Sequence, residues 1–355
     1  MKPINATRWL TAAAMATTLV LSACGGSSSD APETRDTAYG KVQGVDDGAK
    51  SGTYYWKGIP FAQAPAGALR WKAPVAPTAW KDTLQASQFG ASCIQNPRMY
   101  SPGNANTFDA SVGDNILSGH TPGSEDCLSL NIWRPATKEK NLPVIVFIYG
   151  GSNITGYSGD PLYDGAALAK KANAVVVSAN YRLGQLGFFR HPALRDTAVD
   201  PTLTPEDQSG NFAVLDIIQA LKFVQGNIEQ FGGNKANVTL SGQSAGAINV
   251  LAVLTTPGNR AAGLFHRLAP LSGGISVATS PGFPQPANNL QGNNGTIPAL
   301  NPVATYEALS NMLLMKLLID DGTAADVAGG IARVSGQSNA EIAACLRRRT
   351  ASSRL

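Results

Sequence analysis

The chain has 355 residues, of which 43% are hydrophobic and 15% are charged. This length and composition predict one large globular domain, or at most two, with a sizeable core. The formal net charge is +4, but the basic residues are scattered along the chain apart from its last residues. A nucleic-acid-binding protein usually gathers them on one face or helix, so we expect no nucleic-acid partner.

Residues 1–23 have the pattern of an export signal. Lys2 and Arg8 supply positive charge, and residues 9–23 form an uncharged, mostly apolar stretch. The stretch is too short for a permanent transmembrane helix, which needs roughly 20 apolar residues. We therefore interpret residues 1–23 as a signal peptide.

The end of this segment, Leu21-Ser22-Ala23-Cys24, resembles the lipobox of bacterial lipoproteins. In those proteins the signal is cut before the cysteine, which then carries the lipid. The alternative is an ordinary secretory signal that is cut after Ala23. We expect an exported lipoprotein of the cell envelope (periplasm or outer membrane), held to the membrane only through Cys24, or else a secreted protein. Residues 24–38 have the composition of a flexible tether.

Three further cysteines remain if Cys24 carries a lipid. An oxidising compartment permits disulfides, and a bond between Cys93 and Cys127 would close a loop. Residues 97–124 in that loop are rich in Ser, Gly, Asn and Asp and have no helical or strand period. Closing such a loop stabilises a fold by about 3 kcal/mol. Cys345 would then have a partner that is missing, intermolecular or unnecessary.

Short runs of β-branched residues alternate with helical patterns in the middle of the chain. The runs are continuously apolar, as strands buried on both faces of a largely parallel sheet are; they are residues 143–148, 174–178 and 238–241. Helical periodicity lies between them, at residues 160–171 and 215–231. This order predicts a doubly wound α/β sheet with right-handed crossovers.

The remaining segments are more varied. Residues 40–56 resemble twisted antiparallel strands, and residues 280–302, dominated by Asn, Gly and Pro, are typical of a surface insertion. Helical patterns return at residues 304–319 and 340–345. We find no internal repeat.

The run Gly242-Gln243-Ser244-Ala245-Gly246 matches the pattern Gly-x-Ser-x-Gly. The pattern alone is weak evidence, but here it directly follows the buried run 238–241 and precedes the helix-compatible residues 245–254. A nucleophile elbow needs this strand–turn–helix arrangement, because the glycines give room for a strained turn that exposes the serine. We therefore predict Ser244 to be a catalytic nucleophile.

A second glycine segment, residues 149–153, follows the predicted strand 143–148. Gly150 and Gly151 would let two backbone N–H groups approach a substrate oxygen closely. Together with the N–H of Ala245 they would form an oxyanion hole with three donors. A plain turn at the end of a strand is the alternative. The presence of both elements, in order and on neighbouring predicted strands, favours the oxyanion hole.

Several ordered segments resemble the type-B carboxylesterases, the family that includes the cholinesterases. They run from about Tyr39 to Arg347 and comprise residues 57–62, 69–71, 125–132, 180–184, 227–233 and 263–267. The resemblance implies an α/β-hydrolase domain over residues 39–347, with a central, mostly parallel sheet flanked by helices. It also implies hydrolysis of a small-molecule carboxylic ester through an acyl-enzyme.

Site residues follow from the same resemblance. Ser244 matches the nucleophile, whereas Gly150, Gly151 and Ala245 match the oxyanion hole. Cys93 and Cys127 match the first disulfide of the family. No metal or nucleotide motif such as His-Glu-x-x-His or Gly-x4-Gly-Lys-Ser/Thr is present in the sequence, so we expect no metal and no cofactor.

The catalytic acid and base have no recognisable counterpart. In this fold they follow the serine in the order Asp or Glu, then His, but His120 and His191 precede Ser244. His266 lies in a segment whose family histidine is structural. In the family both groups lie beyond the segment that residues 345–347 resemble.

We therefore expect a fold that lacks its C-terminal part, an aberrant tail at residues 348–355, and an esterase impaired by truncation before the acid and the base. The alternative is a non-catalytic binding or surface lipoprotein on the same scaffold. The intact Ser244 and oxyanion loop argue against that alternative, because a binding protein does not need them.

Overall fold

The computed structural model describes residues 33–95, 123–274 and 306–348, all within the compact unit Pro32–Leu355. The predicted signal peptide, Cys24, the insertion at 280–302 and residues 349–355 lie outside these ranges, as does His120. None of the helices in the described ranges has the length and apolar composition that a bilayer crossing requires.

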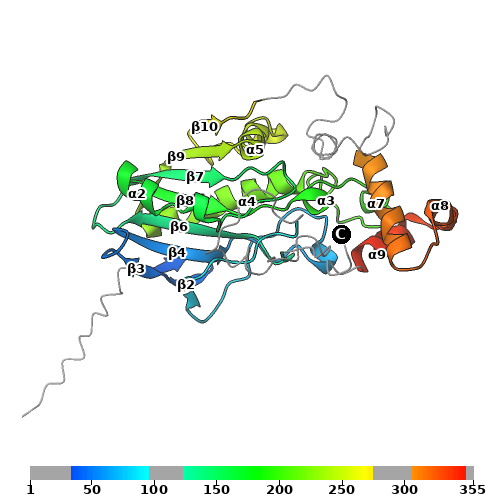
Figure 1. Ribbon diagram of the computed structural model, residues 1–355, viewed down its shortest axis with the longest axis horizontal. Helices are drawn as coiled ribbons and strands as arrows, with labels where there is room; N and C mark the ends of the chain where they lie inside the picture. The colour runs from blue at the N-terminus through cyan, green and yellow to red at the C-terminus, as the bar shows by residue number, and fades with distance from the viewer. Residues whose placement is uncertain (1–32, 96–122, 275–305, 349–355) are drawn as a thin grey trace, which may run out of the picture. The chain divides into compact units, whose positions relative to one another are not determined.

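A seven-stranded sheet forms the centre of the fold, with strands in the order β10-β9-β7-β8-β6-β4-β3 (Figure 1). Its strands are β3 (Val45–Asp47), β4 (Thr53–Pro60), β6 (Ser129–Pro135), β7 (Leu142–Ile148), β8 (Val175–Ala179), β9 (Gly233–Gln243) and β10 (Arg267–Leu271). A second, three-stranded sheet contains β1 (Thr34–Thr37), β2 (Gly40–Gln43) and β5 (Leu84–Gln85).

The central sheet has a parallel half and an antiparallel half. Strands β10, β9, β7 and β8 are parallel to one another, whereas β6, β4 and β3 continue the sheet in antiparallel pairs. Parallel strands align their carboxyl ends at one edge of the sheet, where the ligands of open α/β sheets bind. The loops that follow β7 and β9 therefore emerge side by side.

The helices lie between and after the parallel strands. They are α2 (Ala166–Ala172), α3 (Gly184–Gly187), α4 (Phe212–Asn227), α5 (Ala245–Leu254), α7 (Tyr306–Asp320), α8 (Val327–Ser335) and α9 (Asn339–Arg348). Short 3-10 turns occur at η1 (Gly67–Leu69), η3 (Pro161–Tyr163), η4 (Pro192–Leu194), η5 (Ile228–Phe231) and η6 (Pro257–Asn259). Helix α9 includes Arg348, the first residue of the predicted tail.

Helices cover both faces of the sheet. Val175 and Val177 of β8 belong to one core cluster with α4 and α5, whereas Val176 packs with Trp133 and Ala169 of α2 in another. Successive side chains of a strand point to opposite faces, so α2 lies on the face opposite α4 and α5. All five residues of β8 are buried, as expected for a strand covered on both sides.

A separate hydrophobic cluster joins the last helices to the segments that follow η1 and β8. It contains Trp71, Phe189 and Leu194 together with Leu314 and Leu317 of α7 and Leu346 of α9. Helix α9 contacts both η4 and η1, and a backbone carbonyl of α9, that of Arg347, accepts a 3.1 Å hydrogen bond from Arg70. The end of the described chain is thus packed against its N-terminal half.

The structure confirms the predicted strands and most helices, with shifts at their ends. The helical pattern at 215–231 is α4 followed by η5, and the pattern at 160–171 is η3 followed by α2. Strand β7 differs from the expectation because its burial alternates: Val144, Val146 and Ile148 are buried, whereas Ile145 and Phe147 are half-buried. Helix α8 and strands β6 and β10 were not predicted from the sequence.

Candidate active site

Ser244 lies at the sharp turn between β9 and α5. Its φ of 55° and ψ of −122° are unfavourable for a residue with a side chain. The flanking glycines make this turn possible. A Cβ atom at Gly246 would lie 2.2 Å from the carbonyl oxygen of Ile148, and one at Gly242 would lie 2.5 Å from that of Gly246. The sequence prediction of an elbow at this position is thus confirmed in its geometry.

Neighbouring elements hold the backbone of Ser244 on both sides. Its N–H donates a 2.9 Å hydrogen bond to the carbonyl of Leu271 at the end of β10. Its own carbonyl accepts bonds from Ala247 and Ile248 in the first turn of α5, at 3.0 and 3.1 Å. The strained conformation is therefore fixed by three backbone hydrogen bonds.

Gly150 lies directly beside Ser244, because β7 and β9 are adjacent and end together. A Cβ atom at Gly150 would be 2.9 Å from the Cβ of Ser244 and 2.6 Å from the carbonyl oxygen of Gln243. Within the described ranges, the N–H groups of Gly150 and Gly151 donate to no protein acceptor. Ala245 is the first residue of α5, so its N–H has no acceptor within that helix. The three predicted donors are brought to one edge of the sheet.

The loop after Gly150 has a left-handed backbone over three successive residues. The φ angles are 117° at Gly151, 54° at Ser152 and 59° at Asn153. The carbonyl of Gly151 closes the turn by accepting hydrogen bonds from Ile154 and Thr155, at 3.0 and 3.1 Å. Non-glycine residues in this region are strained and persist only where surrounding contacts hold them.

Asn153 supplies one such set of contacts, which sequence reasoning missed. Its side-chain oxygen accepts a 2.7 Å hydrogen bond from Asn249 of α5, and its backbone carbonyl accepts a 2.6 Å bond from Gly184. Asn249 is 1% exposed and stands among apolar neighbours in the sequence of α5. A single polar residue in an otherwise apolar helical segment is the feature of the sequence that could have indicated this contact.

Two tyrosines support the start of the loop. Tyr149 and Tyr181 stack with ring centroids 4.6 Å apart. The hydroxyl of Tyr181 donates a 2.8 Å bond to the backbone carbonyl of Tyr149, and the hydroxyl of Tyr149 donates back to Tyr181. Burial raises the pKa of Tyr149 far above its ordinary value, so this hydroxyl stays protonated and keeps donating.

The two described histidines have structural contacts. Nδ1 of His191 accepts a 3.1 Å hydrogen bond from the N–H of Ala193 and caps η4. His266 precedes β10, and its Nδ1 accepts from the N–H of Val238. Val238 lies six residues before Ser244 on β9, a distance of roughly 20 Å along an extended strand. His266 is therefore not within reach of Ser244.

The disulfide expected from the resemblance is present. Cys93 and Cys127 are bonded, with Cα atoms 4.9 Å apart across 34 residues of sequence. Both cysteines are buried in the main core cluster. Cys345 lies half-buried in α9, beside the cluster that joins the last helices.

The described ranges contain a further feature that resembles a site, a cavity away from Ser244. They contain no group of three His, Cys, Asp or Glu side chains able to hold a metal ion. The cavity, of about 800 Å³, is lined by residues near the start of α4 and the end of α5, among them Asn211, Leu215, Ala252 and Thr255. Ser244 does not line this cavity, so the cavity does not define the candidate active site.

Comparison with solved structures identifies the fold. A carboxylesterase of Geobacillus stearothermophilus superposes with a TM-score of 0.58 at 31% identity, covering 88% of this chain and 53% of that one. A structure of PNB esterase gives a TM-score of 0.57 at 30% identity, covering 90% and 55%. The chain has the α/β-hydrolase fold.

Sequence comparison identifies the family. The model of the carboxylesterase family matches residues 31–291. A para-nitrobenzyl esterase of Bacillus subtilis is 38% identical over 244 residues, which are 68% of this chain and 44% of that protein. A mouse cholinesterase is 39% identical over 254 residues, or 71% and 39%. The chain belongs to the carboxylesterase family, and it matches less than half the length of these two relatives.

Proposed function

We propose that this protein is a carboxylic-ester hydrolase whose nucleophile is Ser244. The observation that carries the proposal is the position of Ser244 on a strained turn beside Gly150, with open backbone donors next to it. Such a turn exposes a serine hydroxyl above the sheet. Membership of the carboxylesterase family supports the same reaction.

The reaction proceeds through an acyl-enzyme. Oγ of Ser244 bonds to the ester carbonyl carbon as its proton passes to a base, and the carbonyl oxygen becomes an oxyanion. The alcohol then leaves with a proton, and water repeats the attack to release the acid. The N–H groups of Gly150, Gly151 and Ala245 bind the oxyanion, each contributing about 3 kcal/mol of transition-state stabilisation.

We further propose that this protein turns esters over slowly. His191 and His266 are engaged in structural hydrogen bonds through Nδ1, and neither is assigned as the base. With no base positioned among the described residues, an oxyanion hole and binding retain only part of the catalysis, about 10³- to 10⁴-fold over water. Deacylation then becomes slow, and the acyl-enzyme accumulates.

Acyl transfer from p-nitrophenyl acetate tests the proposal. Prolonged incubation should add one acetyl group to the intact protein, and peptide mapping should locate it on Ser244. The Ser244→Ala variant should remain unmodified. Acetylation that is equal in both proteins, or a protein that binds the ester without ever being acylated, would instead identify a binding protein on this scaffold.

The proposed location is the cell envelope, with a lipid on Cys24. The support is the sequence Leu21-Ser22-Ala23-Cys24 after the apolar stretch. A labelled fatty acid should be incorporated into the wild-type protein and not into Cys24→Ala. Processing after Ala23 without lipid would favour the secreted form.

A further inference from the structure

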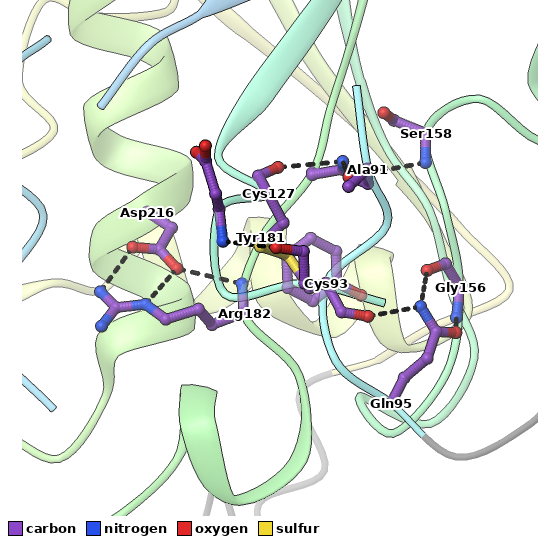
Figure 2. The surroundings of a disulfide bond; sticks show 12 residues. Ala91, Cys93, Gln95, Cys127, Gly156, Ser158, Tyr181, Arg182 and Asp216 are labelled. Carbon is purple, nitrogen blue, oxygen red and sulfur yellow. Dashed lines mark hydrogen bonds and ion pairs between the residues drawn. A yellow bond between two sulfur atoms is a disulfide. The ribbon is translucent and has the colours of Figure 1, made fainter. Parts of the chain in front are cut away.

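The side chain of Gln95 lies buried between the disulfide and the loop that follows Gly150. It is 5% exposed and comes from the segment just after Cys93. Figure 2 shows its amide directed at the backbone of Gly156, at the far end of that loop. Neither sequence reasoning nor the family resemblance assigned it a role.

The Gln95 amide uses all its hydrogen-bonding capacity. Oε1 accepts from the N–H of Gly156 at 2.7 Å and from the hydroxyl of Thr155 at 2.9 Å. Nε2 donates to the carbonyl of Gly156 at 2.8 Å and to that of Cys93 at 2.9 Å. Gly156 thus has both backbone polar groups paired with one side chain, as it would in a strand ladder.

Gly156 in turn lies against the start of the loop. A Cβ atom there would be 2.7 Å from the carbonyl oxygen of Gly150 and 2.4 Å from the ring of Tyr149. Gly156 is therefore packed closely against the Gly150 peptide. The loop between them is left-handed at three residues, and such a conformation persists only where surrounding contacts hold it; the Gly156 contacts are among them.

The segments that contact Gln95 are themselves held in place. Cys93 is tied to Cys127 by the disulfide and is bridged to Ser124. The buried amide of Asn180 donates to the carbonyls of Ala91 and Cys127, and its oxygen accepts from the N–H of Ser158 just beyond the loop. The segments around the disulfide therefore form a rigid support for residues 155–158.

We propose that Gln95 is a positioning residue, which fixes Gly156 and thereby the direction of the Gly150 and Gly151 N–H groups beside Ser244. This inference rests on the proposed function for its effect on the reaction. It assigns Gln95 no contact with substrate.

Two measurements on the full chain test the role. Gln95→Met keeps the volume and removes all four hydrogen bonds. Hydrogen exchange at Ile154, Thr155 and Gly156 should become at least about tenfold faster, since each tenfold corresponds to 1.4 kcal/mol of lost protection. The acetylation rate of Ser244 by p-nitrophenyl acetate should fall about tenfold, less than the 10²–10³ for complete loss of an oxyanion donor. The ester concentration for half-maximal rate should not change.

Gln63→Met is the matched control. Gln63 donates one exposed 3.2 Å bond to the carbonyl of Ala76, so its replacement should leave both measurements unchanged. Gln95→Glu gives a second test, because its carboxylate keeps the acceptor for Gly156 and its protonated form regains one donor. The ratio of the Gln95→Glu acetylation rate to the wild-type rate at the same pH should therefore rise as the pH falls.

The outcomes separate the two claims. Unchanged loop exchange in Gln95→Met would overturn the positioning role, and so would faster exchange with an unchanged acetylation rate. A fall in rate that comes with a higher half-saturating concentration would point to ester binding and also overturn it. If the wild-type protein neither becomes acetylated on Ser244 nor hydrolyses the ester in a way that Ser244→Ala abolishes, the proposed function fails, and the exchange measurement alone then decides whether Gln95 holds the loop.

Discussion

Asn249 of the helix that follows Ser244 donates a 2.7 Å hydrogen bond to the side chain of Asn153 in the glycine loop. Both amides are buried, and the bond joins the helix that follows Ser244 to the loop that carries the proposed oxyanion donors. A shift of α5 relative to this loop would break it. The two halves of the candidate site are therefore coupled through one pair of side chains.

Replacing Asn249 tests this coupling. Asn249→Leu keeps the number and branching of the side-chain heavy atoms but removes the 2.7 Å donor of the buried Asn153 oxygen, whose other donor, the Tyr181 hydroxyl, lies at 3.4 Å. The free energy of unfolding should therefore fall by about 1–3 kcal/mol. Asn153→Gly removes the acceptor and relieves the left-handed φ of 59°. In a double-mutant cycle measured by urea denaturation, the second change should cost less in the presence of the first. Additive losses would contradict a direct coupling.

Gly150 should tolerate no side chain. In Gly150→Ala the new methyl group would lie 2.9 Å from Cβ of Ser244 and 2.6 Å from the carbonyl oxygen of Gln243. We expect acetylation of Ser244 to fall by about 10²-fold, the effect of losing one oxyanion donor, and stability to fall by about 1–3 kcal/mol from overpacking.

Gly226→Ala is the control for this change. Gly226 lies in α4 and has no heavy atom within 4 Å of its Cβ position, so alanine there should stabilise the protein by about 0.5–1 kcal/mol. Equal effects of the two substitutions on denaturation and acetylation would show that the Gly150 contacts are not specific.

The parallel half of the sheet and Ser244 were predictable because each depends on local sequence. A buried strand is a continuous apolar run, and an elbow is a strand, a glycine-flanked serine and a helix within about 20 residues. Gln95 and Asn153 were not predictable in this way. Their partners are 61 and 96 residues away, and a single buried amide produces no periodic pattern in the sequence.

The limits of local patterns also appear in one strand and one helix. The alternating burial of β7 was missed because its half-buried positions, Ile145 and Phe147, are apolar like the buried ones. Helix α8 was missed because two adjacent glycines, Gly329 and Gly330, lower its helical propensity. It is held by Asp326, whose side chain caps its first turn, and by packing of Gly330 against Met315 of α7.

The ion pair between Arg182 and Asp216 should be essential for stability. Their side chains are 3% and 0% exposed and the closest atoms are 2.7 Å apart. Two further hydrogen bonds join the backbone and Nε of Arg182 to the same carboxylate. Asp216→Ala leaves a buried guanidinium without its partner, so stability should fall by about 3–5 kcal/mol.

Glu229→Ala provides the comparison for the buried pair. Its ion pair with Lys235 has a similar 2.8 Å distance, but both side chains are more than half exposed. Its loss should cost no more than about 1 kcal/mol. Urea denaturation of the two variants should therefore differ by several-fold in the loss of stability, and similar losses would argue that the Arg182 pair is solvated.

Asp200 should contribute to stability only above acidic pH. A hydrogen bond from Thr202, followed by one from Lys72, lowers the pKa of Asp200 to about 2. The unfolded chain has the ordinary value of about 3.9. Because the folded pKa is the lower one, the contribution is complete above about pH 5 and is lost progressively as the pH falls towards about 1. Thermal melts of Asp200→Asn should show a flatter dependence on pH in this window, and a parallel curve would contradict the shift.

A small exogenous base should restore turnover at Ser244 if a missing base limits the reaction. Neither described histidine is assigned to that role, because Nδ1 of His191 caps η4 and His266 lies at the far end of β10. Imidazole can take the Ser244 proton during attack and can activate water for deacylation. With p-nitrophenyl acetate, we expect a saturable increase in rate with imidazole in the wild-type protein, above the rate with imidazole alone. Ser244→Ala should show only the solution rate. Rapid, saturable hydrolysis by the wild-type protein without imidazole would instead mean that the chain already supplies its own base.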